Sequence, residues 1–302
     1  MKEVIMKLGT PRLGIYSSSI KAFLEGLGVE IIMPPRITRD MIKLGVANSP
    51  DMICFPFKYT LGQQIWALEQ GATDILMFSS CGICRQKHYH EIQEHILNGL
   101  GYKFKMHVFT SGHISKMLKE VGKVSRLQAH RTWRKIYAAI ERLEKQAYSF
   151  SPDRDLNIGI VGEIGTMLEP DINFDIVRRL QRRGVNVHMS LTIANYLSKK
   201  TNLGKREEKE TRKLLSQELG GHGFESIANT IYYGKNGFDG VIHLLPLSCM
   251  PESTVEPLMD MMAEKYSIPL YRFPMDESNF EAGIKTRVDT FISMLRRRKG
   301  QR

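Results

Sequence analysis

The feature that most constrains the fold is an alternation of short apolar strands with amphipathic helices, which occurs twice along the chain. Strands separated by helices at this spacing predict a mostly parallel sheet that is covered on both faces. In each half, the third strand is followed by a cysteine and then by a helix, a strand and a closing helix. We therefore expect an α/β protein with two lobes of similar design.

The expected elements follow from apolar periodicity and from glycines that stop helices. The predicted strands are residues 4–9, 29–33, 74–78, 104–109, 157–162, 185–189, 240–245 and 269–273. The predicted helices are residues 17–27, 38–46, 59–70, 90–100, 111–118, 127–148, 172–183, 191–197, 207–219, 224–233, 254–265 and 280–297. A Ser/Pro-containing stretch at 149–154 reads as a boundary. The expected divisions are a lobe at 1–123, a linking helix and boundary at 124–152, and a second lobe at 153–302.

The chain's length and cysteine usage limit its class. A chain of 302 residues has room for two domains of ordinary size. Its 4 cysteines stand at irregular spacings, which does not resemble a disulfide framework and favours a reducing compartment. The first residues lack the apolar core of a signal peptide, and no apolar run approaches about 18 residues. We expect a cytoplasmic protein that does not enter a membrane.

The cysteines carry the most specific chemical signal. Cys81 and Cys84 form a C-x-x-C pair directly after the predicted strand at 74–78, and Cys54 and Cys249 each stand two residues before a proline. The C-x-x-C spacing lets two thiolates face one metal, and four thiols complete a site for zinc or an iron–sulfur cluster. Open parallel sheets bind ligands beyond the carboxyl ends of their strands. If the two sheets face each other, these cysteines would converge on a metal site between the lobes.

Other interpretations of the cysteines remain open. Two of the four thiols could be buried and inert, since free cysteine is among the most buried residue types. The C-x-x-C pair could be a thioredoxin-like redox pair. A structural zinc site is a third possibility, although such sites usually combine two close C-x-x-C pairs.

The net charge of +11 suggests partners with negative charge. Nucleic acid is one candidate. However, the basic clusters lie on predicted amphipathic helices and at a helix C-terminus, where cations are favourable. We consider nucleic-acid binding the less favoured reading, and an acidic protein or a phosphate-bearing ligand such as coenzyme A fits at least as well.

One carboxylate is a candidate site residue. Glu163 follows the predicted strand at 157–162, at the expected carboxyl edge of the second sheet. It could act as an acid or a proton relay next to a metal site. It could equally cap the helix that follows or lie at the surface.

Several motifs resemble one family. In the first half, the motifs are Cys54-Phe-Pro-Phe-Lys58 and Cys81-Gly-Ile-Cys84-Arg85. In the second half, they are Ile158-Gly-Ile-Val-Gly-Glu163, Glu169-Pro-Asp-Ile-Asn173, Leu245-Pro-Leu-Ser-Cys249-Met-Pro251, Ile268-Pro-Leu270, Asp276-Glu-Ser278 and Thr286-Arg-Val-Asp-Thr-Phe291. Together, they are similar to motifs of 2-hydroxyacyl-CoA dehydratase component D and acyl-CoA dehydratase activase-related proteins. These motifs cover most of the chain, and their order is more specific than any one of them.

The resemblance implies two flavodoxin-like (Rossmann-like) lobes with an oxygen-sensitive iron–sulfur cluster between them, most simply [4Fe-4S]. On the matching motifs, Cys54, Cys84 and Cys249 are the implied ligands, and Cys81 would be the fourth. The implied partner is an ATPase of actin-like fold that supplies low-potential electrons; a second copy of the chain or a related dehydratase-like subunit is another. The implied activity is electron transfer, reduction or a dehydratase-like lyase reaction. A non-catalytic scaffold or carrier subunit with a structural four-cysteine metal site is the alternative.

Overall fold

The computed structural model describes residues 6–80, 82–109, 125–198, 205–215, 219–279 and 281–301. The chain divides into two compact units, Met1–Leu143 and Glu144–Arg302. The division falls inside the long helix α6 (Arg126–Ala147), which occupies most of the stretch predicted to link the lobes. Predicted features at residue 81 and at 111–118 lie outside the described residues.

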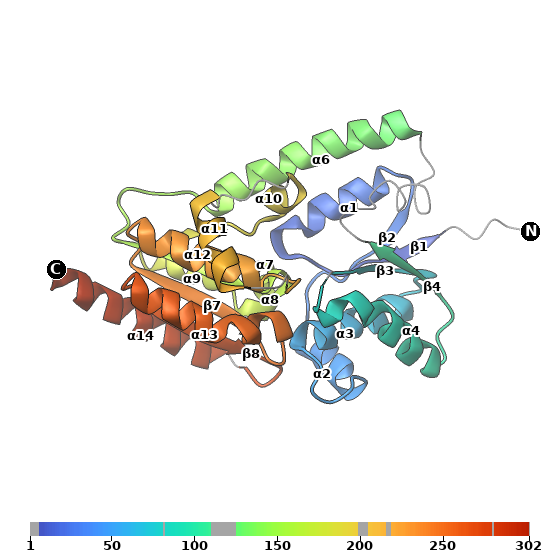
Figure 1. The fold of residues 1–302 in the computed structure, drawn as a ribbon. Helices are drawn as coiled ribbons and strands as arrows, with labels where there is room; N and C mark the ends of the chain where they lie inside the picture. The colour runs from blue at the N-terminus through green and yellow to red at the C-terminus, as the bar shows by residue number, and fades with distance from the viewer. Residues whose placement is uncertain are drawn as a thin grey trace, which may run out of the picture. The chain divides into compact units, whose positions relative to one another are not determined.

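The first unit is built on a parallel sheet with strand order β2-β1-β3-β4. Its strands are β1 (Lys7–Gly9), β2 (Glu30–Ile32), β3 (Asp74–Phe78) and β4 (Lys105–Phe109). The helices are η1 (Gly14–Tyr16), α1 (Ser17–Glu25), α2 (Arg39–Ala47), α3 (Phe55–Glu69), the short η2 (Arg85–His88) and α4 (Tyr89–Gly99). Figure 1 shows α1 and α6 on one side of this sheet and α3 and α4 on the other.

A continuous apolar cluster holds α1 and α6 against the first sheet. Phe23 and Leu24 of α1 pack with Leu8 of β1 and Leu76 of β3, and Trp133 of α6 lies edge-on to the ring of Phe23. Burial of side chains of this size contributes roughly 1.5–3 kcal/mol each. The amphipathic face of α6 is therefore used for packing within the first unit.

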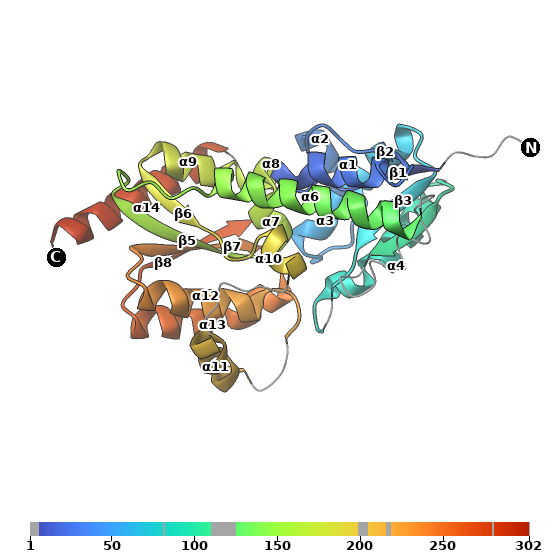
Figure 2. The same cartoon turned by 90° about the horizontal axis from the view of Figure 1, so that it is seen from above.

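The second unit repeats the design with strand order β6-β5-β7-β8, again all parallel. Its strands are β5 (Leu156–Gly162), β6 (Val185–His188), β7 (Gly240–Pro246) and β8 (Leu270–Met275). The helices are α7 (Ile164–Leu168), α8 (Pro170–Asn173), α9 (Ile176–Arg182), α10 (Ile193–Ser198), α11 (Lys205–Leu214), α12 (Gly223–Lys235), α13 (Met250–Lys265) and α14 (Glu281–Gly300). Figure 2 shows α9 and α14 on one face of the sheet and α12 and α13 on the other.

The predicted α/β class with two parallel-sheet, flavodoxin-like lobes is confirmed, because the described strands form two four-stranded parallel sheets flanked by helices. Some boundaries differ from the prediction. Helices α3 and α13 each begin four residues earlier than expected, and the predicted helix at 172–183 is interrupted. The interruption lies at Phe174 and Asp175, whose φ angles are 57° and 55°.

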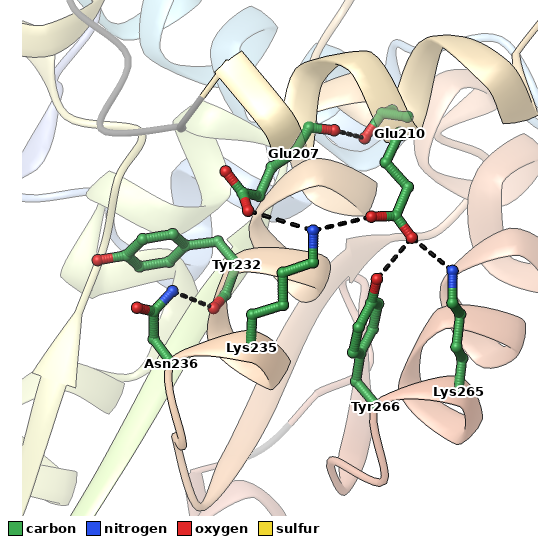
Figure 3. Close-up of polar contacts among 8 residues, drawn as sticks. Glu207, Glu210, Tyr232, Lys235, Asn236, Lys265 and Tyr266 are labelled. Carbon is green, nitrogen blue, oxygen red and sulfur yellow. Dashed lines mark hydrogen bonds and ion pairs between the residues drawn. The ribbon is translucent and has the colours of Figure 1, made fainter.

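Helix α11 is attached to its neighbours by a charged network (Figure 3). Glu210 accepts hydrogen bonds from Lys235 Nζ at 2.8 Å, Lys265 Nζ at 2.6 Å and Tyr266 Oη at 2.5 Å. Because these donors come from α12 and from the end of α13, one carboxylate joins three helices. The donors lower the pKa of Glu210 to about 2, against the opposing effect of burial.

No helix among the described residues is long and apolar enough to cross a membrane.

Candidate functional site

Three of the predicted site residues follow strands that flank the point where a sheet reverses its strand order. In the first sheet the reversal falls between β1 and β3, and in the second it falls between β5 and β7. Ligands of open α/β sheets bind beyond the carboxyl ends of the strands at this point. Cys84 follows β3, Glu163 follows β5 and Cys249 follows β7. The topology therefore gives each unit a candidate ligand-binding edge.

Cys54 stands at the N-cap position of α3, directly before Phe55, with extended backbone angles of φ −69° and ψ 149°. Pro56 stands at the second helical position, where its missing N–H removes a donor that would otherwise lack a partner. The side chain is buried, and its thiol forms a hydrogen bond with the hydroxyl of Tyr89. The partial positive charge at a helix N-terminus stabilises a thiolate at such a position.

Cys84 lies in the turn that precedes the 3₁₀ helix η2, and it is partly exposed. The next residue, Arg85, donates a hydrogen bond from Nη1 to the carbonyl of Met52 at 3.1 Å. Tyr89, the first residue of α4, reaches the Cys54 thiol and packs edge-on against the ring of Phe57. These contacts hold the Cys54 turn beside the Cys84 turn within the first unit.

Cys249 repeats the arrangement of Cys54 in the second unit. It caps α13, is buried, and has Pro251 at the second helical position. Ser248 before it has a left-handed φ of 62°, which turns the chain sharply from β7 into the helix. A Cys-x-Pro helix start thus occurs once in each unit.

The donor chemistry of Cys54, Cys84 and Cys249 suits a thiolate-bound metal. Cys81, the fourth predicted ligand, lies outside the described residues. Among the residues that are described, no group of three or more His, Cys, Asp or Glu side chains is arranged to hold a metal ion. The structure brings the turns of Cys54 and Cys84 together, and the meeting of Cys249 with them stays a prediction.

Glu163 caps helix α7. Its carboxylate accepts hydrogen bonds from the backbone of Gly165 at 2.8 Å and of Thr166 at 2.7 Å, and from the Thr166 hydroxyl at 2.8 Å. Burial raises its pKa, while these hydrogen bonds act in the opposite direction. The capping role, which was one of the alternatives for Glu163, accounts for its position.

A second group of polar residues at this edge was not predicted from the sequence. His243 of β7 contacts Glu252 of α13, with Nε2 and Oε2 2.9 Å apart, and the Ser226 hydroxyl of α12 donates to the same oxygen at 2.8 Å. His243 and Glu252 are 0% exposed. A histidine inside the apolar strand of residues 240–245 was the available signal for this contact.

Two more ionisable residues adjoin this group, at the start of α12. Burial raises the pKa of Glu225 to about 7, and the charges of Glu252 and Glu208 contribute to the rise. Burial lowers the pKa of His222, against an opposing effect of Glu252. We call the set of residues His222, Glu225, Ser226, His243 and Glu252 the Glu252 cluster.

Helix α12 can approach α13 closely because position 223 is a glycine. A Cβ atom there would lie 2.6 Å from the Pro251 carbonyl oxygen, closer than real Cβ contacts come. The first turns of α12 and α13 therefore touch, which places His222 and Ser226 next to the turn that carries Glu252.

Sequence comparison finds no match to this chain, either among models of known protein families or among curated proteins. The resemblance to the dehydratase and activase-related proteins stays a prediction.

Proposed function

We propose that this protein binds an iron–sulfur cluster, most simply [4Fe-4S], through Cys54, Cys81, Cys84 and Cys249. The observation that supports this most is the repeated Cys-x-Pro helix start, in which Cys54 and Cys249 cap α3 and α13. The partial positive charge of a helix N-terminus favours the thiolate, the form that binds iron. The hydrogen bond from Arg85 to the Met52 carbonyl holds the turn of Cys84 next to the turn of Cys54.

The proposed role is to accept low-potential electrons from an ATP-dependent activase of actin-like fold and to use them in electron transfer, reduction or a dehydratase-like lyase reaction. A bound cluster would supply one-electron redox chemistry. This chain's own contribution would be the burial of Cys54 and Cys249, which shields these two ligands from water, and the hydrogen bond between Tyr89 and Cys54. The net charge of +11 favours an acidic docking surface on the partner.

The test is metal analysis of protein purified without oxygen. We expect about four irons and about four acid-labile sulfides per chain, with an EPR signal after reduction. Cys54→Ser and Cys249→Ser should each lower iron binding severely, because each removes one ligand. Ser253→Ala, an exposed position in the next turn of α13, is the matched control and should leave iron content unchanged.

Three results would count against this function. Stoichiometric zinc in the wild type would indicate a scaffold with a structural metal site. Full iron content in both serine variants would remove Cys54 and Cys249 from the metal site. No metal in well-folded wild-type protein would remove the site itself.

The partner is tested separately with reduced activase and ATP. We expect the visible absorbance of the cluster to bleach only when both are present. Bleaching by activase without ATP, or none with ATP, would contradict an ATP-driven donor while leaving the metal site itself intact.

A further inference from the structure

The second unit contains a buried ionisable pair that needs a proton. Glu252 and His243 are 0% exposed, and among the described residues no lysine or arginine forms an ion pair with Glu252. A buried carboxylate without a compensating charge costs several kcal/mol, so such groups are paired or protonated. The 2.9 Å contact between His243 Nε2 and Glu252 Oε2 requires one hydrogen between the two atoms, which either the imidazole or the carboxyl carries.

The pair also presents hydrogen-bonding atoms that the described protein leaves unsatisfied. Glu252 Oε1 and His243 Nδ1 are buried and have no hydrogen-bond partner among the described residues. The other carboxylate oxygen is occupied by His243 and by the hydroxyl of Ser226. Because buried polar atoms are almost always paired, Oε1 marks a position for a donor such as an ordered water or a protic ligand.

The Glu252 cluster includes a residue of α12 that solvent reaches. Glu225 is only half-buried, and it directly precedes Ser226, whose hydroxyl bonds to Glu252. The ionisable groups that act on Glu225 and Glu252 come from every neighbouring element: Glu163 before α7, Glu208 on α11, His222 before α12, and His243 on β7. Glu225 therefore responds to the charge of Glu252 and is also reached by solvent.

The cluster is also placed for chemistry. Glu252 stands in the first turn of α13, directly beyond β7, and Glu163 stands directly beyond β5. These two strands flank the reversal point of the second sheet. A ligand that occupied the expected crevice would lie next to the group that holds the proton.

We propose that the Glu252 cluster is a proton relay that exchanges a proton between solvent and a ligand at the β5–β7 edge. Glu252 gives its proton to a carbonyl or other basic oxygen of the ligand, and Glu225 returns a proton from solvent. Atoms balance because one proton enters for each one delivered, and no oxidant is required. This role is independent of the proposed iron–sulfur cluster, since the relay needs no metal.

The test is carbon-13 NMR of glutamate side-chain carboxyls in the full-length protein, titrated between about pH 4 and pH 9. We expect one glutamate, assigned by its loss in Glu225→Gln, to titrate near neutral pH. In Glu252→Gln, which keeps the side chain's size, this midpoint should fall by about one pH unit, because the ionisable group of the relay that raises the pKa of Glu225 is lost. Glu264→Gln, at an exposed position of α13, is the control and should not move it.

Each outcome decides the proposal. The relay proposal is wrong if the titration midpoint of Glu225 lies near 4.5 in the wild type, the ordinary value for glutamate. It is also wrong if this midpoint does not change in Glu252→Gln. If Glu252→Gln does not fold, Ser226→Ala replaces it, because that variant removes the hydroxyl link while keeping both carboxylates. A shift of the Glu225 midpoint in Ser226→Ala would support coupling, and an unchanged midpoint would contradict it. Iron content in the same variants tests the metal site separately.

Discussion

The two units share a sheet topology and a Cys-x-Pro helix start, but the side chains around their cysteines differ. In the first unit, Cys54 is bonded to Tyr89 and its turn is tied to the Cys84 turn by Arg85. In the second, the helix capped by Cys249 carries Glu252, with a buried histidine and serine against it. In the first unit, the candidate site therefore contains thiols held close together. In the second unit, it contains one thiol together with acid–base groups. The comparison teaches that a repeated fold fixes where a site lies and not its chemistry.

The units also share a way of seating the cysteine-capped helices. In the first, a Cβ atom at Gly62 of α3 would lie 1.9 Å from the Met41 carbonyl oxygen of α2. In the second, Gly223 of α12 meets Pro251 of α13 in the same manner. Both helices therefore lie backbone to backbone with a neighbour, which fixes where their N-termini point.

The largest expected effect comes from breaking these contacts. We expect Gly62→Ala to lower the free energy of unfolding by about 3 kcal/mol or more, because backbone atoms must move apart. Gly223→Ala should cost less, about 1–2 kcal/mol, since its closest approach is 2.6 Å. Urea denaturation followed by circular dichroism measures both.

Matched controls exist in each unit. Gly99 of α4 and Gly283 of α14 have open space around a new Cβ atom, so alanine there should stabilise by about 0.5–1 kcal/mol. If Gly62→Ala proved as stable as Gly99→Ala, the tight seating of α3 on α2 would be wrong.

A smaller effect is expected from the buried histidine–carboxylate pair of the first unit. Asp74 begins β3, and its Oδ1 lies 2.7 Å from His107 Nε2 while the Thr73 hydroxyl donates to Oδ2. Asp74→Asn should cost about 1–3 kcal/mol, because it disturbs a buried hydrogen-bonded group. Unlike Glu252, Asp74 stands at the amino end of its strand, away from the ligand-binding edge.

This difference in position makes the pair informative. Asp74→Asn should destabilise the first unit while iron content and the titration of Glu225 stay as in the wild type. Thermal unfolding, metal analysis and carboxyl NMR on the one variant check all three. A change in Glu225 titration would show that the two units are not electrostatically separate.

How far the sequence predicts the fold depends on how local the signal is. The strand at 74–78 was predicted at its observed bounds because an apolar run stops abruptly at polar residues. The predicted starts of α3 and α13 lie four residues too late, because a proline next to a predicted helix does not by itself show whether it lies inside the helix. Both prolines occupy the second helical position, where the helix does not need their N–H.

Hydrogen bonds of one side chain account for the interrupted helix. The Asn173 side chain donates to the carbonyls of Thr166 and Met167, at 2.9 Å and 2.8 Å, and accepts from the backbone of Ile176. These contacts hold the chain in a bend that helical periodicity cannot reveal. The prediction from 172 to 183 therefore merged two short helices.

The same distinction applies to the site. Cysteines are few, so Cys54, Cys84 and Cys249 stood out in the sequence. Glu252 and His243 did not, because their pairing depends on how β7 and α13 pack. Glutamate is common on helix surfaces, and only the folded unit shows that this one is buried.

The smallest expected effect compares two carboxylates of the second unit with opposite pKa shifts. Glu210 accepts from two lysines and a tyrosine, which lower its pKa to about 2, whereas burial raises the pKa of Glu225 to about 7. The stabilisation from Glu210 is present above its unfolded pKa and is lost as pH falls through about 2. That from Glu225 is present at low pH and is lost as pH rises through about 7.

Glu210→Gln should therefore lower the free energy of unfolding by about 1 kcal/mol near neutral pH, a value reduced by partial solvent exposure. The difference from wild type should shrink as the pH approaches about 2, where the native carboxylate takes up its proton. Glu225→Gln should show the reverse trend and gain stability relative to wild type above about pH 7. Urea unfolding over this pH range measures both, with Glu264→Gln as the exposed control. If the free energies of unfolding of the two variants changed with pH in the same way, Glu210 and Glu225 would not differ in their electrostatic environment. The expected difference between the charged network of α11 and the Glu252 cluster would then be wrong.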